Sequence, residues 1–177
     1  MLRGEEKNRG IFVTVGTTCF DELVAAVTTA EFADRLTELG YRWLRVQVGR
    51  GTEPTFLGET TVHRTWFRFT PDIPSEMEKA AVVISHGGAG SVTEALALQK
   101  RLIVCVNESL MGNHQEELAV ELHSRRHLIL AKPADISNAV SAIEHADLEP
   151  YGTYDDSLFP ALVDAEMARP RPACTLS

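Results

Sequence analysis

Short apolar runs alternate with longer amphipathic stretches along this chain. The apolar runs are rich in β-branched residues and are bounded by glycine, proline or polar turn residues, a pattern typical of buried β-strands. They predict strands at 11–15, 41–48, 62–69, 81–85, 102–106 and 127–130. Between them, apolar residues at helical spacing predict helices at 20–39, 74–79, 91–98, 113–123 and 134–145. This alternation predicts an α/β fold, a Rossmann-like, six-stranded, mainly parallel sheet with helices on both faces.

The chain has the size of one domain with a tail. Its 177 residues fall within the ~100 to 200 residues of a typical single domain. We assign residues 1–146 to that domain, because the sequence becomes acidic and turn-like after about residue 147. The 147–177 tail predicts an amphipathic helix that packs either on its own domain or on a partner chain. Its apolar residues at helical spacing are Leu158, Phe159, Leu162, Val163 and Met167.

Composition narrows the class of partner. A formal net charge of -8 argues against non-specific binding of nucleic acid and against attraction to anionic lipid surfaces. Any bound phosphate must therefore be held by local groups. No apolar stretch approaches the ~20 residues of a membrane-spanning helix, and the first ten residues lack the apolar segment of a secretory signal. We expect a cytoplasmic chain that does not insert into a membrane.

Several well-known chemical motifs are missing from the sequence. Its 3 cysteines are widely spaced and form no C-x-x-C pair, which argues against a disulfide framework and against a zinc site. The chain contains neither the G-x-x-x-x-G-K-[S/T] of a P-loop nor the G-x-S-x-G of an esterase. The glycines at 87–90 follow the fourth predicted strand and lack the G-x-G-x-x-G spacing on an early strand, so an NAD site is not favoured.

The predicted strand at 81–85 runs directly into a glycine-rich segment and then into a helix. Glycines allow a tight turn and let a ligand approach the main chain, and the unpaired N–H groups of a helix amino terminus attract anions. The alternative is a turn needed only to pack the helix on the strand. We predict a phosphate site that consists of Gly87, Gly88, Ala89, Gly90 and Ser91.

Two side chains beside this segment extend the predicted site. Glu94 lies one helical turn further on, where its carboxylate can accept hydrogen bonds from a sugar hydroxyl next to the phosphate. The same residue fits a capping box with Ser91, in which the carboxylate binds the first N–H of its own helix, and the spacing does not separate the two roles. His86 ends the strand beside the glycines, a position that favours a contact in the site over a place in the core.

Other loops can reach the same place. Because parallel strands end at one edge of a sheet, the loops that follow different strands can meet there. The loop after the first predicted strand contains Gly16, Thr17 and Thr18. The turn after the second contains Gly49 and Gly51. We expect both loops to line the ligand site.

The helix predicted at 113–123 opens with polar residues. Asn113 is suited to cap this helix, with Glu116 at the matching capping-box position. That local role does not explain His114 and Gln115, whose imidazole and amide groups suit the hydroxyls of a sugar. Together with the phosphate site, these residues predict a site for a nucleotide sugar.

Four of these segments resemble one enzyme family in their order and spacing. They read VTVGTT at 13–18, QVGRG at 47–51, ISHGGAGS at 84–91 and NESLMGNHQ at 107–115. They are similar to the cytosolic catalytic subunit of the two-chain N-acetylglucosaminyltransferase of the dolichol pathway. That family in turn resembles the donor-binding, C-terminal half of GT-B glycosyltransferases. The similarity extends from about residue 11 to residue 130.

The resemblance implies a reaction and a set of roles. N-acetylglucosamine would move from UDP-N-acetylglucosamine to N-acetylglucosaminyl-diphosphodolichol with inversion, the second step of lipid-linked oligosaccharide assembly for N-glycosylation. Residues 1–146 would form a UDP-sugar-binding domain, with 87–91 at the diphosphate, Glu94 at the ribose and 113–115 at the donor sugar. The match favours ribose binding for Glu94. It implies no cofactor and no metal ion, and the absence of a D-x-D motif agrees.

The resemblance also implies a partner. One Rossmann-like domain is about half of a complete GT-B enzyme, so the acceptor-binding half must come from another chain. The family has a membrane-anchored partner subunit, which would recruit this chain to the cytosolic face of the endoplasmic reticulum. The general base lies either on that partner or at His86. Two rival hypotheses are a self-sufficient nucleotide-sugar epimerase or hydrolase, and a non-catalytic nucleotide-binding module.

Overall fold

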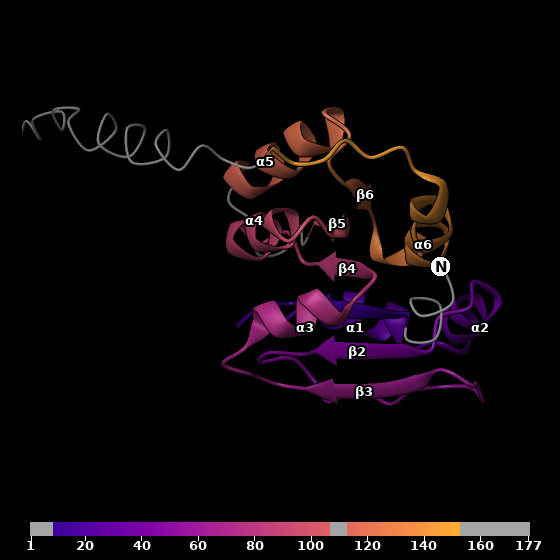
Figure 1. The fold of residues 1–177 in the computed structure, drawn as a ribbon. Coiled ribbons are helices and arrows are strands. Elements are labelled where there is room, and N and C mark those ends of the chain that lie inside the picture. Colours follow the sequence, from indigo (N-terminus) through magenta and orange to yellow (C-terminus); the bar gives the residue numbers. More distant parts are fainter. Residues whose placement is uncertain (1–8, 107–112, 153–177) are drawn as a thin grey trace, which may run out of the picture.

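The computed structural model describes residues 9–106 and 113–152, with the backbone alone for 113–116. Within these residues one sheet runs through the centre of the molecule in the order β3-β2-β1-β4-β5-β6, and all neighbouring strands are parallel (Figure 1). The prediction of a six-stranded Rossmann-like sheet is therefore confirmed. The strands are β1 (Gly10–Thr14), β2 (Trp43–Gln47), β3 (His63–Phe67), β4 (Val82–Ser85), β5 (Arg101–Cys105) and β6 (Ile129–Ala131).

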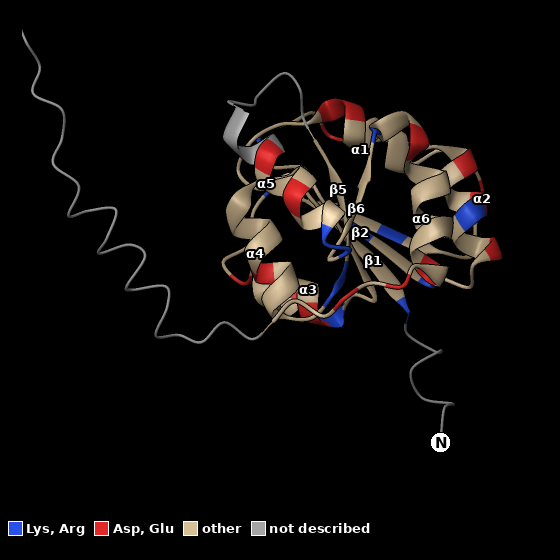
Figure 2. Ribbon diagram, turned by 90° about the horizontal axis from the view of Figure 1, so that it is seen from above, with Lys and Arg blue, Asp and Glu red and all other residues tan. Residues whose placement is uncertain are grey.

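Helices cover both faces of this sheet. Figure 2 shows α1, α2 and α6 on one side of the strands and α3, α4 and α5 on the other. Ile11 and Val13 of β1 lie in the core beneath the first group, while Phe12 between them lies in the core beneath the second. Burial on both faces explains why three consecutive residues of this central strand, Ile11 to Val13, are all apolar. The helices are α1 (Asp21–Val27), α2 (Ala30–Glu38), α3 (Ile73–Lys79), α4 (Ala89–Ala97), α5 (Asn113–Ser124) and α6 (Ile136–His145), with a 3₁₀ turn, η2 (Pro133–Asp135), before α6.

The single helix expected at 20–39 is instead two helices, so that prediction was wrong. The Thr28 hydroxyl turns back to donate to the Val24 carbonyl at 2.9 Å, which ends α1. The Thr29 hydroxyl then accepts from the Phe32 amide at 3.1 Å and caps the start of α2. Threonine side chains compete with the helix for backbone groups in this way, and apolar spacing does not register that competition.

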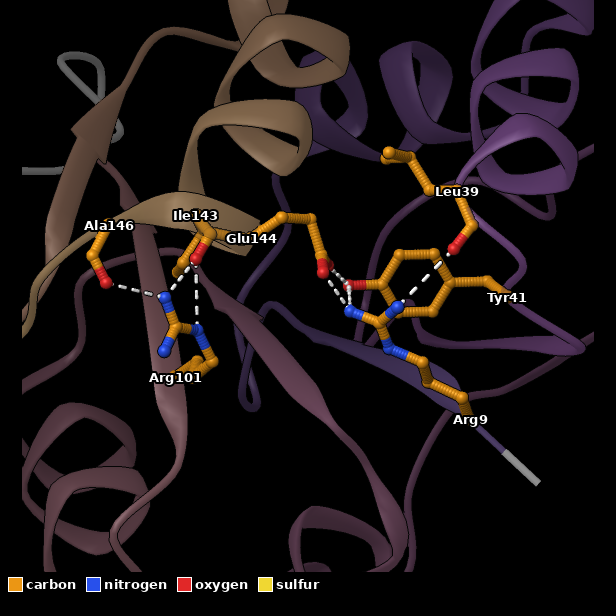
Figure 3. Close-up of polar contacts among 7 residues, drawn as sticks. All are labelled: Arg9, Leu39, Tyr41, Arg101, Ile143, Glu144 and Ala146. Carbon is orange, nitrogen blue, oxygen red and sulfur yellow. Dashed lines mark hydrogen bonds and ion pairs between the residues drawn. The ribbon is translucent and has the colours of Figure 1, made fainter. Parts of the chain in front are cut away.

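The amino-terminal ends of the strands are closed by a partly buried polar cluster (Figure 3). Arg9, just before β1, forms an ion pair with Glu144 of α6, and the Tyr41 hydroxyl donates to the same carboxylate. Burial, reinforced by this hydrogen bond, raises the pKa of the Tyr41 phenol well above its ordinary value. Nearby, the Arg101 guanidinium donates to the Ile143 carbonyl at 2.9 Å. These contacts fasten α6 at the end of the sheet opposite to the predicted ligand site.

Beyond α6, the segment 147–152 returns to pack against the domain. The Glu149 amide donates to the Arg126 carbonyl at 2.8 Å, and the Gln99 side chain donates to the Tyr151 carbonyl at 2.7 Å. The amphipathic helix predicted for the rest of the tail falls on residues 153–177, outside the described residues. Of the helices described here, none combines the length and the apolar character needed to cross a membrane.

Candidate functional site

The glycine-rich segment after β4 presents free main-chain amides at the start of α4. The helix begins at Ala89 with Gly88 as its N-cap, and its first backbone hydrogen bond runs from the Val92 amide to the Gly88 carbonyl at 3.0 Å. The amides of residues 89–91 precede that bond and have no acceptor within the helix. Ala89 and Gly90 are exposed and Ser91 is partly exposed, so a ligand can reach this end of the helix. We name residues 87–91 the cradle.

The start of α4 removes one of the two roles considered for Glu94. A capping box requires Ser91 as N-cap, but Ser91 lies inside the helix, and the N-cap, Gly88, has no side chain to accept a hydrogen bond. The capping-box alternative was therefore wrong. The physical reason is that Gly88, three residues before Ser91, already adopts the N-cap conformation. Glu94 is half-buried on α4, one turn from the exposed amides, and the ribose role stays a prediction.

His86 stands between the cradle and the loop after β1. A β-carbon built on Gly88 would lie 2.6 Å from the ring Nε2, and one built on Gly16 would lie 2.9 Å from Cε1. The ring thus occupies the space that these two glycines leave. Its Nδ1 lies 3.3 Å from the Thr14 carbonyl, which can only accept, so Nδ1 carries the proton and the Nε2 lone pair is free. Burial lowers the pKa of this imidazole, although the hydrogen bond to Thr14 opposes the shift.

We expect His86 to titrate below its ordinary pKa of 6.5. The unfolded chain then takes up this proton at a higher pH than the folded chain does. The stability contributed by the neutral ring is therefore complete above about pH 6.5 and is lost as the pH falls toward the folded pKa. The measurement is an NMR titration of the ring Cε1–H signal, assigned with His86→Gln. A midpoint at or above 6.5 would contradict the desolvated, neutral ring.

A buried polar pair supports the loop at 16–18. The Thr14 hydroxyl donates to the Gln47 side-chain oxygen at 2.6 Å and accepts from the Gly16 amide at 3.0 Å. Thr14 is fully buried and Gln47 is 3% exposed. Because a buried polar group is costly unless it is hydrogen-bonded, this pair fixes how the chain leaves β1. Both residues lie in the motifs quoted above, but sequence analysis assigned no role to either, although a glutamine inside an apolar strand is itself a signal.

The turn at 49–51 packs directly on the 16–18 loop. Gly49 has a φ of +53°, and a β-carbon there would lie 2.3 Å from the Thr18 carbonyl oxygen. A β-carbon on Gly51 would lie 2.4 Å from the Asp21 carboxylate. Close packing therefore explains both glycines without a ligand: Gly49 packs on the 16–18 loop and Gly51 on the first residue of α1. Their predicted contact with the substrate stays a prediction.

Two charged side chains that sequence analysis missed hold this turn. The Arg68 guanidinium donates to the Gly51 carbonyl at 2.8 Å and to the Gly49 carbonyl at 3.3 Å. The Asp21 carboxylate accepts from the amide and the hydroxyl of Thr52 at 2.9 and 2.7 Å. Each bond joins residues far apart in the sequence, so no local motif signals it.

The residues predicted to contact the donor sugar lie on the next strand connection. Asn113, His114 and Gln115 form the first turn of α5, and of this turn the structure describes the backbone only. The loop at 107–112 that leads into it lies outside the described residues. Since β5 neighbours β4, α5 follows the strand next to the one that carries the cradle. The sheet order thus places this turn, the cradle and the 16–18 loop after three adjacent strands, β5, β4 and β1.

A hollow of about 520 Å³ lies elsewhere, between α5, β6 and α6, and is lined by residues such as Val120, Leu130 and Asn138. No cradle residue lines it. The cradle suits an anion better, because it offers main-chain amide donors whereas the lining of this hollow is mainly apolar. Among the described residues, no three histidine, cysteine, aspartate or glutamate side chains converge as a metal site would require.

The model of the glycosyltransferase family 28 C-terminal domain matches residues 10–158. The chain belongs to this family. The UDP-N-acetylglucosamine transferase subunit ALG13 of Yarrowia lipolytica is 39% identical over 137 residues, which are 76% of this chain and 70% of that protein. Its Homo sapiens counterpart is 41% identical over 141 residues, 75% of this chain but only 12% of that protein. The resemblance inferred from the four motifs is thereby confirmed.

Solved structures agree on the architecture of this family 28 domain. An NMR structure of ALG13 superposes with a TM-score of 0.65 at 25% identity and covers 91% of this chain and 98% of that one. The crystal structure of Acinetobacter baumannii MurG gives a TM-score of 0.57 at 14% identity and covers 92% of this chain but 44% of MurG. The second likeness concerns the fold alone. It confirms that the chain has the fold of one half of a GT-B glycosyltransferase.

Proposed function

We propose that this chain is the donor-binding, catalytic subunit of a glycosyltransferase that moves N-acetylglucosamine from UDP-N-acetylglucosamine to N-acetylglucosaminyl-diphosphodolichol. This is the second step of lipid-linked oligosaccharide assembly for N-glycosylation. The observation that carries the proposal is the start of α4, where exposed amides follow a glycine N-cap in a family 28 domain. The names of the related ALG13 proteins indicate that the sugar donor is UDP-N-acetylglucosamine.

In this proposal the cradle stabilises the departing UDP. The acceptor hydroxyl attacks the anomeric carbon of the donor from the face opposite to UDP, the bond to the diphosphate breaks, and the configuration inverts. Negative charge grows on the diphosphate, where the amides of residues 89–91 and the positive end of the α4 dipole lie. These groups supply the stabilisation that a metal ion supplies in other transferases. Glu94 would bind the ribose, and Asn113, His114 and Gln115 the donor sugar.

The proton of the acceptor hydroxyl needs a base. His86 is the candidate in this chain, because its Nδ1 is engaged by the Thr14 carbonyl and its ring is neutral near pH 7, which leaves a lone pair on Nε2. A base on the partner subunit is the alternative arrangement. Gly16, Thr17 and Thr18 would close the cleft beside this ring, since the Gly16 backbone lies against it.

The acceptor half of the enzyme would come from another chain. The related ALG13 proteins are named as subunits of a transferase, which supports a second chain as the source of that half. We propose a membrane-anchored partner subunit that holds the dolichol-linked acceptor and recruits this chain to the cytosolic face of the endoplasmic reticulum. In this arrangement residues 1–146 form the UDP-sugar-binding domain, and the 147–177 tail packs on the domain or on the partner.

A transfer assay with radiolabelled UDP-N-acetylglucosamine tests this function. We expect transfer to a dolichol-linked acceptor when the chain is combined with its membrane partner, and little or none by the chain alone. Isothermal titration should show tighter binding of UDP-N-acetylglucosamine than of UDP-glucose or NAD. Full activity of the isolated chain would favour a self-sufficient enzyme. Donor binding without transfer in either form would favour the non-catalytic binding module, and tighter binding of NAD would refute the donor assignment.

A further inference from the structure

Several hydrogen bonds fix the conformation of the turn at 49–51. Arg50 donates its amide to the Thr18 carbonyl at 2.9 Å, and the Gly51 amide donates to the Val48 carbonyl at 2.8 Å. The Arg68 guanidinium binds two further carbonyls of the turn. The two glycines are accounted for by this packing, because a β-carbon on either would meet neighbouring atoms. What the turn presents outward is the side chain of Arg50.

Arg50 is exposed at the carboxyl end of β2. Within residues 9–106 and 113–152, its guanidinium makes no hydrogen bond or ion pair. Two acidic side chains beside this turn already have partners. Asp21 accepts from Thr52 at 2.7 Å, and Glu53 pairs with Arg68 at 3.2 Å. In the described part of the chain, no acidic group therefore neutralises the positive charge of Arg50.

We propose that Arg50 binds the diphosphate of the acceptor, at an anion site separate from the cradle. This inference rests on the proposed function, in which both substrates carry a diphosphate. The strands β2, β1 and β4 are consecutive in the sheet, so two strand spacings, roughly 10 Å in total, separate Arg50 from the cradle. One diphosphate in the cradle leaves this second position free.

The arrangement of the faces assigns Arg50 to the acceptor rather than to the donor. Glu94, the proposed ribose contact, lies on α4, on the face covered by α3, α4 and α5. The 49–51 turn is instead tied to Asp21, the first residue of α1 on the opposite face. The proposed sugar contacts follow β5, on the other side of the cradle from β2. If Glu94 and residues 113–115 have these proposed roles, the ribose and the sugar of the donor both extend away from Arg50.

The test compares three variants of the full chain. Arg50→Gln removes the charge, and Arg50→Lys keeps it without the planar guanidinium. Arg42→Gln is the matched control, because Arg42 is an exposed arginine just before the opposite end of the same strand. In transfer assays with the partner, we expect Arg50→Gln to raise the acceptor KM about tenfold, as for one lost charge-assisted hydrogen bond. Arg50→Lys should recover part of this loss, Arg42→Gln should match the unaltered chain, and the UDP Kd should stay within about twofold in all three.

A second measurement separates this inference from the proposed function. The chain saturated with UDP is titrated with inorganic pyrophosphate, and binding is expected in the unaltered chain and lost in Arg50→Gln. An unchanged acceptor KM, or a parallel loss of UDP affinity, would overturn the acceptor site. Equal pyrophosphate affinity in the unaltered chain and in Arg50→Gln would also overturn the acceptor site. If the unaltered chain with its partner transfers no sugar but binds pyrophosphate through Arg50, the anion site stands and its assignment to the acceptor fails with the proposed function.

Discussion

Gly49→Ala is expected to destabilise the folded chain by about 3–5 kcal/mol, in the range reserved for severe substitutions. Gly49 adopts a φ of +53°, a left-handed conformation that costs a residue with a β-carbon about 1–2 kcal/mol. The added carbon would also lie 2.3 Å from the Thr18 carbonyl oxygen and 2.8 Å from that of Gly16. Both contacts are with backbone, so relief requires the loop after β1 to move away from the turn.

Urea denaturation measures this loss, and Gly40→Ala provides the control. Gly40 also has a left-handed φ, +77°, but a β-carbon there meets nothing within 4 Å. Gly40→Ala should therefore lower the free energy of unfolding only by the cost of the left-handed conformation, about 1–2 kcal/mol. The difference between the two variants measures the steric contact between the loops. Equal losses for the two would show that the 49–51 turn separates from the 16–18 loop at little cost.

Gly88→Val is expected to lower UDP affinity about a hundredfold, equivalent to about 2.7 kcal/mol or roughly two charge-assisted hydrogen bonds. The backbone of Gly88 has an ordinary φ of -60°, so valine does not strain the chain itself. Its β-carbon would however lie 2.6 Å from the His86 ring, which is confined on its other side by Gly16. The branched side chain would also shield the amides that follow. A further loss of about 1–3 kcal/mol of stability is expected from the crowded ring.

Gly90→Val separates the ligand effect from the packing effect. Among the described residues outside its own helix, a β-carbon on Gly90 meets no atom within 4 Å. Stability should therefore be nearly unchanged, whereas a phosphate in the cradle would still be obstructed. Titration calorimetry with UDP and denaturation with urea give the two readouts for each variant. Gly152→Val, in open space at the end of the described chain, is the control for affinity. Normal UDP binding by Gly90→Val would place the diphosphate away from the start of α4.

The local sequence pattern was sufficient to predict structure wherever the conformation of a segment depends on that segment alone. The apolar runs with β-branched residues predicted every strand and the α/β class, because burial on both faces leaves a recognisable sequence. The glycines after the fourth strand predicted a turn that opens a helix, since this conformation depends on neighbouring residues only. The same reasoning failed at Thr28 and Thr29, where side-chain hydrogen bonds divide an apparently continuous helix.

The sequence by itself therefore determined the order of strands and helices along the chain, the family and the position of the cradle. Tertiary structure alone decided which loops touch. It packed Gly49 closely on Thr18, a role that the sequence does not reveal, and it brought Arg68 and Asp21 to the same turn. It also paired Thr14 with Gln47 beneath the site. These contacts join residues that are distant in the sequence. They depend on the order of the strands in the sheet, and no local sequence pattern encodes that order.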